Sequence, residues 1–392
     1  MKKALLILSL WVMVSPLACQ QLAKKNSDGS TGWSSQMQSL DHTLKNIIPL
    51  VYNRKEFADP RNEKKIRMHM KSFSKSIHNI SPKNSKKLVG EDPLFNFTLN
   101  RFRGDLKRAT ESFDSGHKEY TRSIVQTMVG HCFRCHTRNA MGPEFKGGVL
   151  NITDLKLDRL SKVDLLVAAR RYDEALVLLE KIIGDSKKGG DFAFEMDRAL
   201  RRYLSLTIRV KKSFGKAEAM LERLSESKTV PYYLVEYIRQ WEKSLKNLPP
   251  WLKQKKTAKK PISAAKKMIR RARNTQEYRK DHSADVEYLA ASAILHDGLM
   301  TKIKQPSQRT EAYFLLGGCY EALGDLGYWS LNEFYYEACI REWPRGPWAR
   351  RCYERLEESV FVGYSGSSGI HVPYHEKKRL EELKNLIFID PL

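Results

Sequence analysis

Two thiols and an imidazole lie within five consecutive residues, Cys132-Phe133-Arg134-Cys135-His136. Cysteines three positions apart lie about one helical turn from each other, so both can add to the two vinyl groups of one porphyrin. The residue that follows them delivers an imidazole to the iron. The C-x-x-C-H pattern therefore predicts one covalently attached c-type haem, with Cys132 and Cys135 as attachment residues and His136 as the proximal iron ligand.

The other chemistry that this motif allows is a zinc site or a thiol redox centre. The sequence has no second C-x-x-C for a structural zinc site, no H-E-x-x-H and no recognisable Ser/His/Asp motif. His131 precedes the motif, but it cannot serve the same iron from the same helical turn. We therefore expect His131 to be partly exposed or hydrogen-bonded to a haem propionate.

Residues 1–19 have the organisation of an export signal. Lys2 and Lys3 precede an apolar stretch from Ala4 to Val14, which is too short to span a bilayer. Leu-Ala-Cys at the end of this segment predicts a bacterial lipoprotein with Cys19 lipidated; ordinary secretion and cleavage is the alternative. Export agrees with the haem motif, because bacteria attach c-type haem outside the cytoplasm. We expect a periplasmic protein, attached to a membrane by its lipid anchor only.

The chain of 392 residues has a formal net charge of +24 and is 41% hydrophobic. This composition indicates globular packing, and the length allows two or more domains. The positive charge favours acidic protein surfaces, anionic lipid heads or a negatively charged cell-wall polymer as partners. Nucleic acid is excluded as a partner by the export signal and by the absence of any nucleic-acid motif.

Residues 35–142 contain four segments with apolar residues at helical spacing and no strand-like alternation. The four stripes are Met37, Leu40, Leu44, Ile47 and Val51; Ile66, Met70, Phe73, Ile77 and Ile80; Leu99, Phe102, Leu106, Ala109 and Phe113; and Tyr120, Ile124 and Met128. The last segment runs directly into Cys132 and Cys135. Four amphipathic helices with short connections predict an antiparallel four-helix bundle that carries the haem at the end of its last helix.

This part of the chain resembles the class II c-type cytochromes, which include cytochrome c′. Besides Cys132, Cys135 and His136, the matching residues are Phe57 and Asp59 after the first helix and Phe95, Phe97 and Phe102 at the third. The resemblance covers roughly residues 35–140 and implies a monohaem four-helix bundle. Pro49 inside the first helix and Thr137-Arg138 after the motif depart from the family pattern.

In the low-spin members of that family the sixth iron ligand is a methionine near the start of the first helix. The resemblance therefore implies Met37 as the distal ligand, and His42 is the main rival. Met128 and Met141 are poorer candidates, because both lie close in sequence to the haem-bearing turn. Without a distal side chain the iron would be five-coordinate and open to diatomic gases or peroxide.

From residue 161 onward, helical signals recur in units that resemble tetratricopeptide repeats. One unit begins at Tyr172-Asp173-Glu174-Ala175 and a similar one at Phe214-Gly215-Lys216-Ala217, and the clearest unit spans Tyr313 to Pro344. The predicted fold is all-α, a four-helix haem bundle followed by an α-solenoid of tetratricopeptide-like hairpins. An irregular helical domain is the alternative.

The predicted organisation is completed by linkers and a tail. Residues 20–34 and 143–160 are linkers, residues 161–248 and 286–360 hold the repeats, residues 249–285 are a basic linker or helix, and residues 361–392 are a Gly/Ser loop with a helix from Glu376 to Phe388. Three further cysteines, Cys319, Cys339 and Cys352, lie in the C-terminal helices. Three buried thiols are the simplest interpretation, and one disulfide among them is the alternative, for which Cys319 and Cys352 could meet if adjacent hairpins stack.

These features predict an exported monohaem cytochrome that transfers single electrons, with repeats that dock a redox or scaffold protein partner of acidic surface. The chain is then an electron carrier rather than a catalyst. One alternative is an assembly lipoprotein in which the repeats do the work and haem is structural or sensory. Another is a five-coordinate haem protein that reacts with gas or peroxide.

Overall fold

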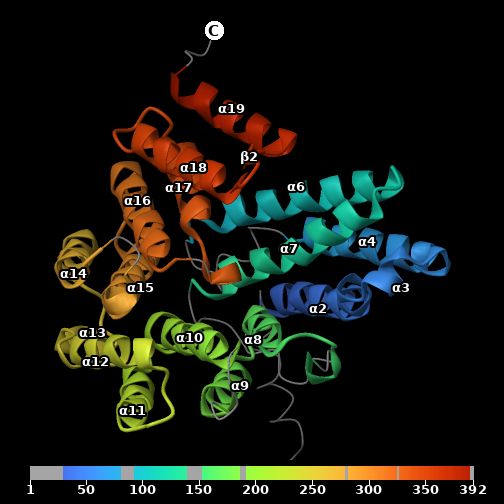
Figure 1. The fold of residues 1–392 in the computed structure, drawn as a ribbon. Helices are drawn as coiled ribbons and strands as arrows, with labels where there is room; N and C mark the ends of the chain where they lie inside the picture. Colours follow the sequence, from blue (N-terminus) through green and yellow to red (C-terminus); the bar gives the residue numbers. More distant parts are fainter. Residues whose placement is uncertain are drawn as a thin grey trace, which may run out of the picture.

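The computed structural model describes residues 30–80, 92–138, 152–185, 191–278, 281–324 and 326–388. The expected export segment with Cys19 lies outside these ranges, as does Met141. The described residues fold almost entirely into helices, together with one short antiparallel pair of strands, β1 (Ser365–Gly366) and β2 (Gly369–Ile370) (Figure 1). The all-α prediction is confirmed.

Each of the four apolar segments expected in the first part of the chain forms a helix. The N-terminal helices are α2 (Ser30–Tyr52), α3 (Arg54–Ala58), η1 (Pro60–Asn62), α4 (Glu63–His78), α6 (Phe95–Asp114) and α7 (Lys118–His136). Asn53 and Asp59 begin the two short helices, because the side chain of each accepts a backbone N–H of the following turn. Pro49 lies inside α2, on its exposed side.

The four long N-terminal helices alternate in direction. Ser39 near the start of α2 lies 2.8 Å from Ser76 near the end of α4, hydroxyl to hydroxyl. The ring of Phe73 meets that of Phe102 in α6 at 5.4 Å, and Phe102 stacks at 4.9 Å on His131 in α7. The start of α2 and the end of α7 therefore lie at the same end of this group of helices.

The predicted apolar stripes form a buried cluster between these helices. Its members include Leu40, Ile47, Val51, Ile66, Met70, Phe73, Ile77, Leu99, Phe102, Leu106, Ala109, Phe113, Ile124, Val125 and Met128. Each contributes an apolar face that packs on its neighbours, which is the main source of helix stability in a folded protein. Tyr120 was expected in the fourth stripe, but this is wrong, because its side chain is 45% exposed.

The remainder of the described chain is a succession of helices, most of which contact the next helix along the chain. These C-terminal helices are η2 (Ile152–Asp154), α8 (Arg159–Ala168), α9 (Tyr172–Gly184), α10 (Asp191–Leu204), the π-helical η3 (Ser205–Val210), α11 (Phe214–Ser225), α12 (Tyr232–Lys246), α13 (Pro250–Lys253), α14 (Pro261–Thr275), η4 (His282–Ala284), α15 (Asp285–Thr301), α16 (Pro306–Ala322), η5 (Gly327–Trp329), α17 (Asn332–Glu342), α18 (Ala349–Gly363) and α19 (Tyr374–Phe388). Within the described ranges, no helix has both the length and the apolar character needed to cross a membrane.

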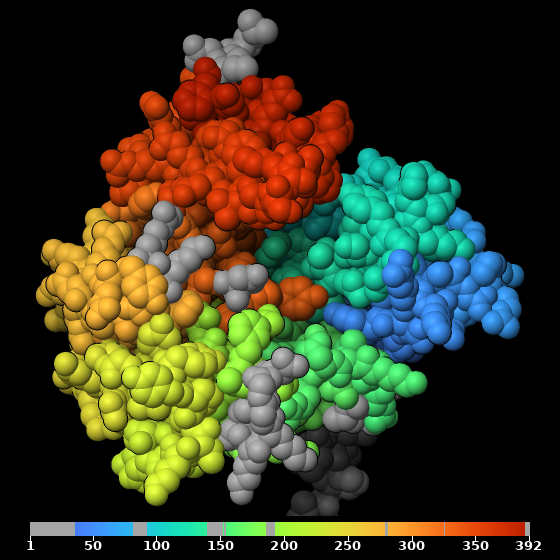
Figure 2. Space-filling model, in the orientation of Figure 1, coloured from blue at the N-terminus to red at the C-terminus, as the bar shows by residue number. Residues whose placement is uncertain are grey.

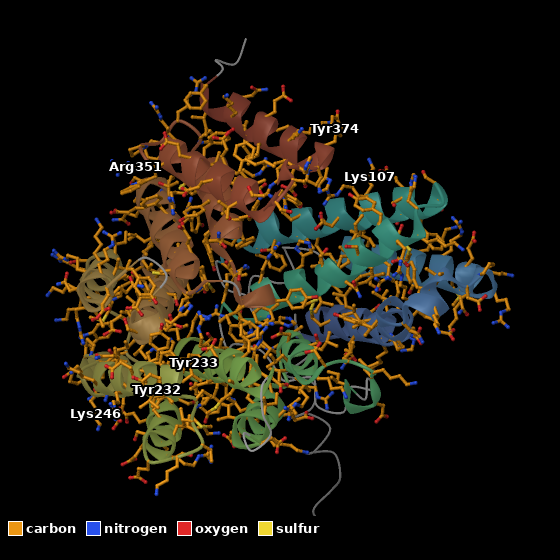
Figure 3. All side chains as sticks on the ribbon, in the orientation of Figure 1. Lys107, Tyr232, Tyr233, Lys246, Arg351 and Tyr374 are labelled. Carbon is orange, nitrogen blue, oxygen red and sulfur yellow. A yellow bond between two sulfur atoms is a disulfide. The ribbon has the colours of Figure 1, made fainter. Side chains whose placement is uncertain are left out.

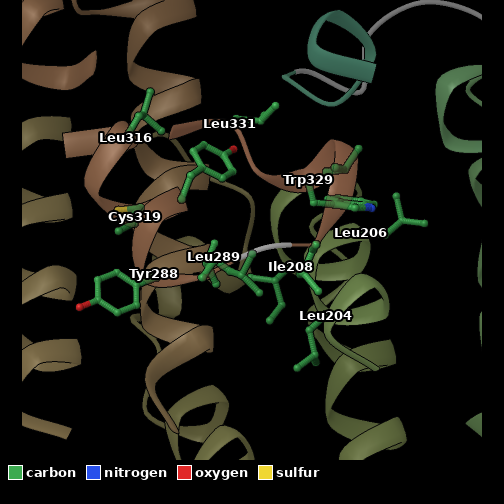
Figure 4. Packing of buried hydrophobic residues seen from close by; sticks show 14 of the residues in the cluster. Leu204, Leu206, Ile208, Tyr288, Leu289, Leu316, Cys319, Trp329 and Leu331 are labelled. Carbon is green, nitrogen blue, oxygen red and sulfur yellow. The ribbon is translucent and has the colours of Figure 1, made fainter. Parts of the chain in front are cut away.

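The N-terminal and C-terminal helices share one core. Ile48, Val129 and Phe133 belong to the same buried cluster as the apolar residues of α8 to α19. The ring of Phe133 meets that of Trp329 edge to face at 4.6 Å. Figure 4 shows part of this core around Leu206 and Trp329, and Figure 2 shows the N-terminal helices, blue to teal, against the rest of the molecule. The end of α7 is therefore enclosed by residues from both parts of the chain.

The cysteines of the C-terminal helices correct the sequence prediction. Cys339 of α17 and Cys352 of α18 form a disulfide bond, with their Cα atoms 6.3 Å apart. Cys319 is a buried free thiol. Three thiols and a Cys319–Cys352 bond are therefore both wrong, whereas the alternative of one disulfide among the three cysteines is confirmed. The reason is the pairing of helices, since α17 lies directly against α18 and brings these two positions together.

Candidate cofactor site at the end of α7

Cys132, Cys135 and His136 occupy the last turn of α7 and share one face of it. With 3.6 residues per turn, this is also the face of Val125 and Met128, which are buried in the cluster between the N-terminal helices. Cys132 and Cys135 pack against the same cluster, and both are free thiols. Cys132 and Cys135 are thus directed toward the interior of the N-terminal helices, whereas the His136 ring binds the backbone oxygen of Ala168 on α8.

Thr137 and Arg138, which follow the motif, fix the end of α7. The backbone N–H of Thr137 donates to the carbonyl of Phe133 at 2.9 Å and closes the last turn. Arg138 then binds Asp92 with its Nε at 3.0 Å and its Nη2 at 2.6 Å, and both side chains are buried. Arg138 Nη2 lies 4.0 Å from the sulfur of Cys135. This ion pair anchors the motif to the segment before α6.

His136 forms a hydrogen bond that selects one form of its ring. Its Nδ1 lies 2.5 Å from the backbone oxygen of Ala168, the last residue of α8. A carbonyl oxygen only accepts, so Nδ1 carries the proton and Nε2 carries the lone pair. Burial, followed by the positive charge of Arg170, lowers the pKa of His136 to about 4, against the opposing effect of the bond to Ala168. The ring is therefore neutral at pH 7.

The two thiols of the motif are protonated at neutral pH. Burial raises the pKa of Cys132 to about 12 and also raises the pKa of Cys135. Catalytic and redox-active dithiols need a thiolate, which a lowered pKa provides. The environment of Cys132 and Cys135 thus does not fit the thiol redox centre that the motif also allowed.

Cys132, Cys135 and His136 are surrounded by protein and still keep some solvent-accessible surface. Cys132, Cys135 and His136 each keep part of their surface accessible, although desolvation shifts the pKa of each side chain as it does for a buried group. Side chains with both properties have protein atoms around them and some uncovered surface of their own. The three motif side chains are therefore covered by protein on part of their surface only.

His131 differs from the sequence expectation. It is buried rather than partly exposed, and its Nε2 lies 2.7 Å from the carboxylate of Asp105 on α6. Burial lowers the pKa of His131 to about 4, against the opposing effect of Asp105. Burial alone would raise the pKa of Asp105, but the hydrogen bond from His131 holds it below its usual range. His131 thus links α7 to α6.

The two candidate distal ligands lie in different environments. Met37 is half-buried and packs against the same cluster as Cys132 and Cys135. It belongs to the start of α2, which is at the same end of the N-terminal helices as the motif. His42 is exposed and lies near His69 on α4, whose pKa its charge helps to lower. Met37 as the iron ligand stays a prediction.

Sequence reasoning missed the contribution of the C-terminal helices to this site. Ala168 binds the ring of His136, the hydroxyl of Tyr172 donates to the backbone oxygen of His136 at 2.7 Å, and Arg170 lies between these two residues in sequence. Tyr172 was noticed only as the start of a repeat-like unit. A contact between residues 32 positions apart has no local sequence signal, so only the fold reveals it.

Within the described ranges, no group of three or more His, Cys, Asp or Glu side chains is arranged to hold a metal ion. Comparison of this chain with protein-family models, with curated proteins and with solved structures found no match.

Proposed function

We propose that this chain is an exported monohaem c-type cytochrome that transfers single electrons. Cys132 and Cys135 bind the porphyrin through thioether bonds, and His136 Nε2 is the proximal iron ligand. The observation that carries this proposal is the hydrogen bond from His136 Nδ1 to Ala168 O, 2.5 Å long, at the end of a C-x-x-C-H motif. It gives the imidazole the tautomer and the neutral charge that an iron ligand needs.

The residues of the chain have separate tasks in this function. The haem, when bound, would supply an iron centre that can exchange one electron with a donor and an acceptor protein. Cys132 and Cys135 would hold it by thioether bonds in either oxidation state. Ala168 orients the ring of His136. No proton transfer or bond cleavage is needed for the exchange.

On the distal side we propose Met37 as the sixth ligand and not His42. The support is its position, because Met37 packs against the cluster that contacts both cysteines, whereas His42 is exposed. A methionine thioether favours Fe(II), which raises the reduction potential, and it leaves little geometry to change on electron transfer. This favours an electron carrier over a haem protein that binds gas or peroxide.

We further propose that the N-terminal helices are the haem bundle and that the C-terminal helices form the repeat-like docking module. Large side chains exposed on the C-terminal helices support a docking role, among them Tyr232, 95% exposed, and Tyr374, 80% exposed (Figure 3). The net charge of +24 favours a partner with an acidic surface. The Cys339–Cys352 disulfide supports a location in an oxidising compartment, which agrees with export and lipidation at Cys19.

The proposal is tested by producing the full chain with its export signal in a bacterium that carries a haem-maturation system. Acid-acetone extraction removes haem that is not covalently bound. We expect the haem absorbance to stay with the protein, and to be lost in the double variant Cys132→Ser/Cys135→Ser. Cys319→Ser is the matched control, because it removes a buried thiol elsewhere and should retain the haem. Complete extraction of haem from the wild-type protein would contradict the proposal.

A further inference from the structure

The turn between α8 and α9 keeps an arginine where glycine is the usual residue. Arg170 has φ 59°, in the left-handed region. Its N–H donates to Val167 O at 3.0 Å, and the N–H of Arg171 donates to Leu166 O at 2.8 Å. This pair of bonds is the Schellman motif, in which the left-handed position favours glycine because a Cβ strains the backbone there. An arginine at this position therefore accepts backbone strain that glycine would avoid.

The same turn holds His136 by two contacts. The carbonyl of Ala168 is among those that a helix end leaves without an intrahelical donor, and it accepts the His136 Nδ1–H at 2.5 Å. The hydroxyl of Tyr172 donates to the backbone oxygen of His136 at 2.7 Å. The guanidinium of Arg170 lies 5.7 Å from the ring centre of Tyr172, and the Arg170 side chain is only 7% exposed. A positive charge is thus buried beside the residue that would bind iron.

We propose that the α8–α9 turn sets the reduction potential of the haem. The positive charge of Arg170 in this turn raises that potential. This inference rests on the proposed function. It assigns to the C-terminal helices a direct part in the redox site, in addition to partner docking.

The sign follows from electrostatics. Loss of an electron makes the iron centre more positive, so a nearby cation disfavours Fe(III) and raises the potential. The carbonyl of Ala168 has the opposite effect, because a hydrogen bond to Nδ1–H makes the imidazole a stronger donor. The charge of Arg170 lies close to the site, since its guanidinium is next to the ring of Tyr172, whose hydroxyl binds the backbone oxygen of His136. The turn therefore applies two opposing influences to one ligand.

The test is the variant Arg170→Gly in the full-length, haem-loaded protein. Glycine suits the left-handed backbone, so we expect folding stability to be retained or increased. We expect covalent haem to be unchanged and the midpoint potential, measured by spectroelectrochemistry at pH 7, to shift downward. Arg170→Lys keeps the charge and should stay near the wild-type potential. If the glycine variant does not fold, Arg170→Gln removes the same charge and gives the same comparison.

Lys255 offers a matched control at the end of α13. It has φ 57°, and the N–H groups of Lys255 and Lys256 repeat the same bonds, to Leu252 O and Trp251 O. Its side chain is exposed. Lys255→Gly therefore removes one charge and the same backbone strain away from the motif, and we expect no change in potential.

Two results separate a failure of this inference from a failure of the proposed function. If Arg170→Gly binds haem and has the same potential as Lys255→Gly, the role of the turn is refuted while the proposed function stands. If the wild-type protein has no covalent haem, the proposed function itself fails.

Discussion

His131 and His136 lie five positions apart on α7, both bound by neighbouring helices, but they use different ring nitrogens. His131 binds the carboxylate of Asp105 with Nε2, whereas His136 binds the carbonyl of Ala168 with Nδ1. A proximal histidine would coordinate the iron through Nε2, which requires the proton on Nδ1. Of these two histidines only His136 has its proton on Nδ1. Residue type alone does not distinguish the two histidines, but their hydrogen bonds do.

The first prediction concerns Met37, the proposed distal ligand. Met37→Leu keeps the apolar volume and removes the thioether sulfur. We expect the haem-loaded variant to lose the near-infrared absorption of thioether-bound Fe(III), to bind carbon monoxide as Fe(II), and to have a lower midpoint potential, because the ligand that favours Fe(II) is gone. Absorption spectra with and without carbon monoxide measure this.

His42→Ala is the control for that experiment, since the exposed imidazole should leave all three properties unchanged. If His42→Ala opens the iron to carbon monoxide and Met37→Leu does not, the distal ligand is assigned wrongly. If neither variant differs from a wild-type protein that already binds carbon monoxide, the iron is five-coordinate.

At the scale of elements, two adjacent glycines of α16 have unequal surroundings. A Cβ on Gly317 would overlap the ring of Tyr336 on α17, whereas a Cβ on Gly318 would meet nothing within 4 Å. Glycine within a helix costs stability relative to alanine, so Gly317 is explained by the close approach of α17. This contact sets how near the two helices of the clearest repeat-like unit pack.

The second prediction compares alanine substitutions at Gly317 and Gly318. Gly317→Ala should destabilise the protein by about 1–3 kcal/mol, the usual range for overpacking a tight core. Gly318→Ala should stabilise it by about 0.5–1 kcal/mol, the gain for replacing glycine within a helix. Denaturant unfolding followed by circular dichroism measures both. Equal effects of the two substitutions would show that α16 and α17 do not pack as described.

Periodicity predicted the elements well because an amphipathic helix repeats its apolar residues locally. The stripes Ile66 to Ile77 and Leu99 to Phe113 are buried as expected. Tyr120 fails because it lies at the start of its helix, beyond the core, near His375 of α19. Arg170 in a left-handed turn had no sequence signal, since glycine is the residue that marks such positions. Local patterns therefore identified the motif and missed the turn that supports it.

At the scale of the whole molecule, Glu337 of α17 joins the N-terminal and C-terminal helices. Its carboxylate is buried and pairs with Arg101 of α6 at 3.0 Å, Arg341 of α17 at 2.7 Å and Arg379 of α19 at 2.8 Å. Burial alone would raise the pKa of Glu337, but the three arginines, Arg379 foremost, lower it to about 2. Three cations from three helices thus share this anion, and Arg379 also pairs with Glu376 at 2.8 Å.

This gives the third prediction. Because the pKa of Glu337 is lowered on folding, its contribution to stability is complete above the unfolded value near 4.5 and is lost as the pH falls toward 2. Glu337→Gln should therefore reduce the free energy of unfolding at pH 7 by about 3–5 kcal/mol, the usual cost of breaking a buried ion pair. The difference from wild type should shrink between pH 4.5 and pH 2.

Glu354→Gln is the control, because its pairing with Arg350 is exposed and such pairs contribute about 0–1 kcal/mol. Urea unfolding at a series of pH values measures all three proteins. A difference between wild type and Glu337→Gln that stays constant down to pH 2 would contradict the assigned pairing.

Long-range pairs are the part of this molecule that sequence reasoning could not supply. Cys339 bonds to Cys352 and not to Cys319, because α17 packs against α18. Ala168 reaches His136 only because α8 packs against α7. Such pairs depend on the packing of helices, which periodicity does not report. The motif residues could be chosen from the sequence, whereas the partners that orient them required the fold.

The central claim, that Cys132 and Cys135 carry a porphyrin, is tested most directly by mass spectrometry of the protein purified after export from a cell with a haem-maturation system. The account predicts an intact mass increased by one haem, with the added mass on the single peptide that contains Cys132-Phe133-Arg134-Cys135-His136. Unmodified thiols at both positions in protein from such cells would contradict it.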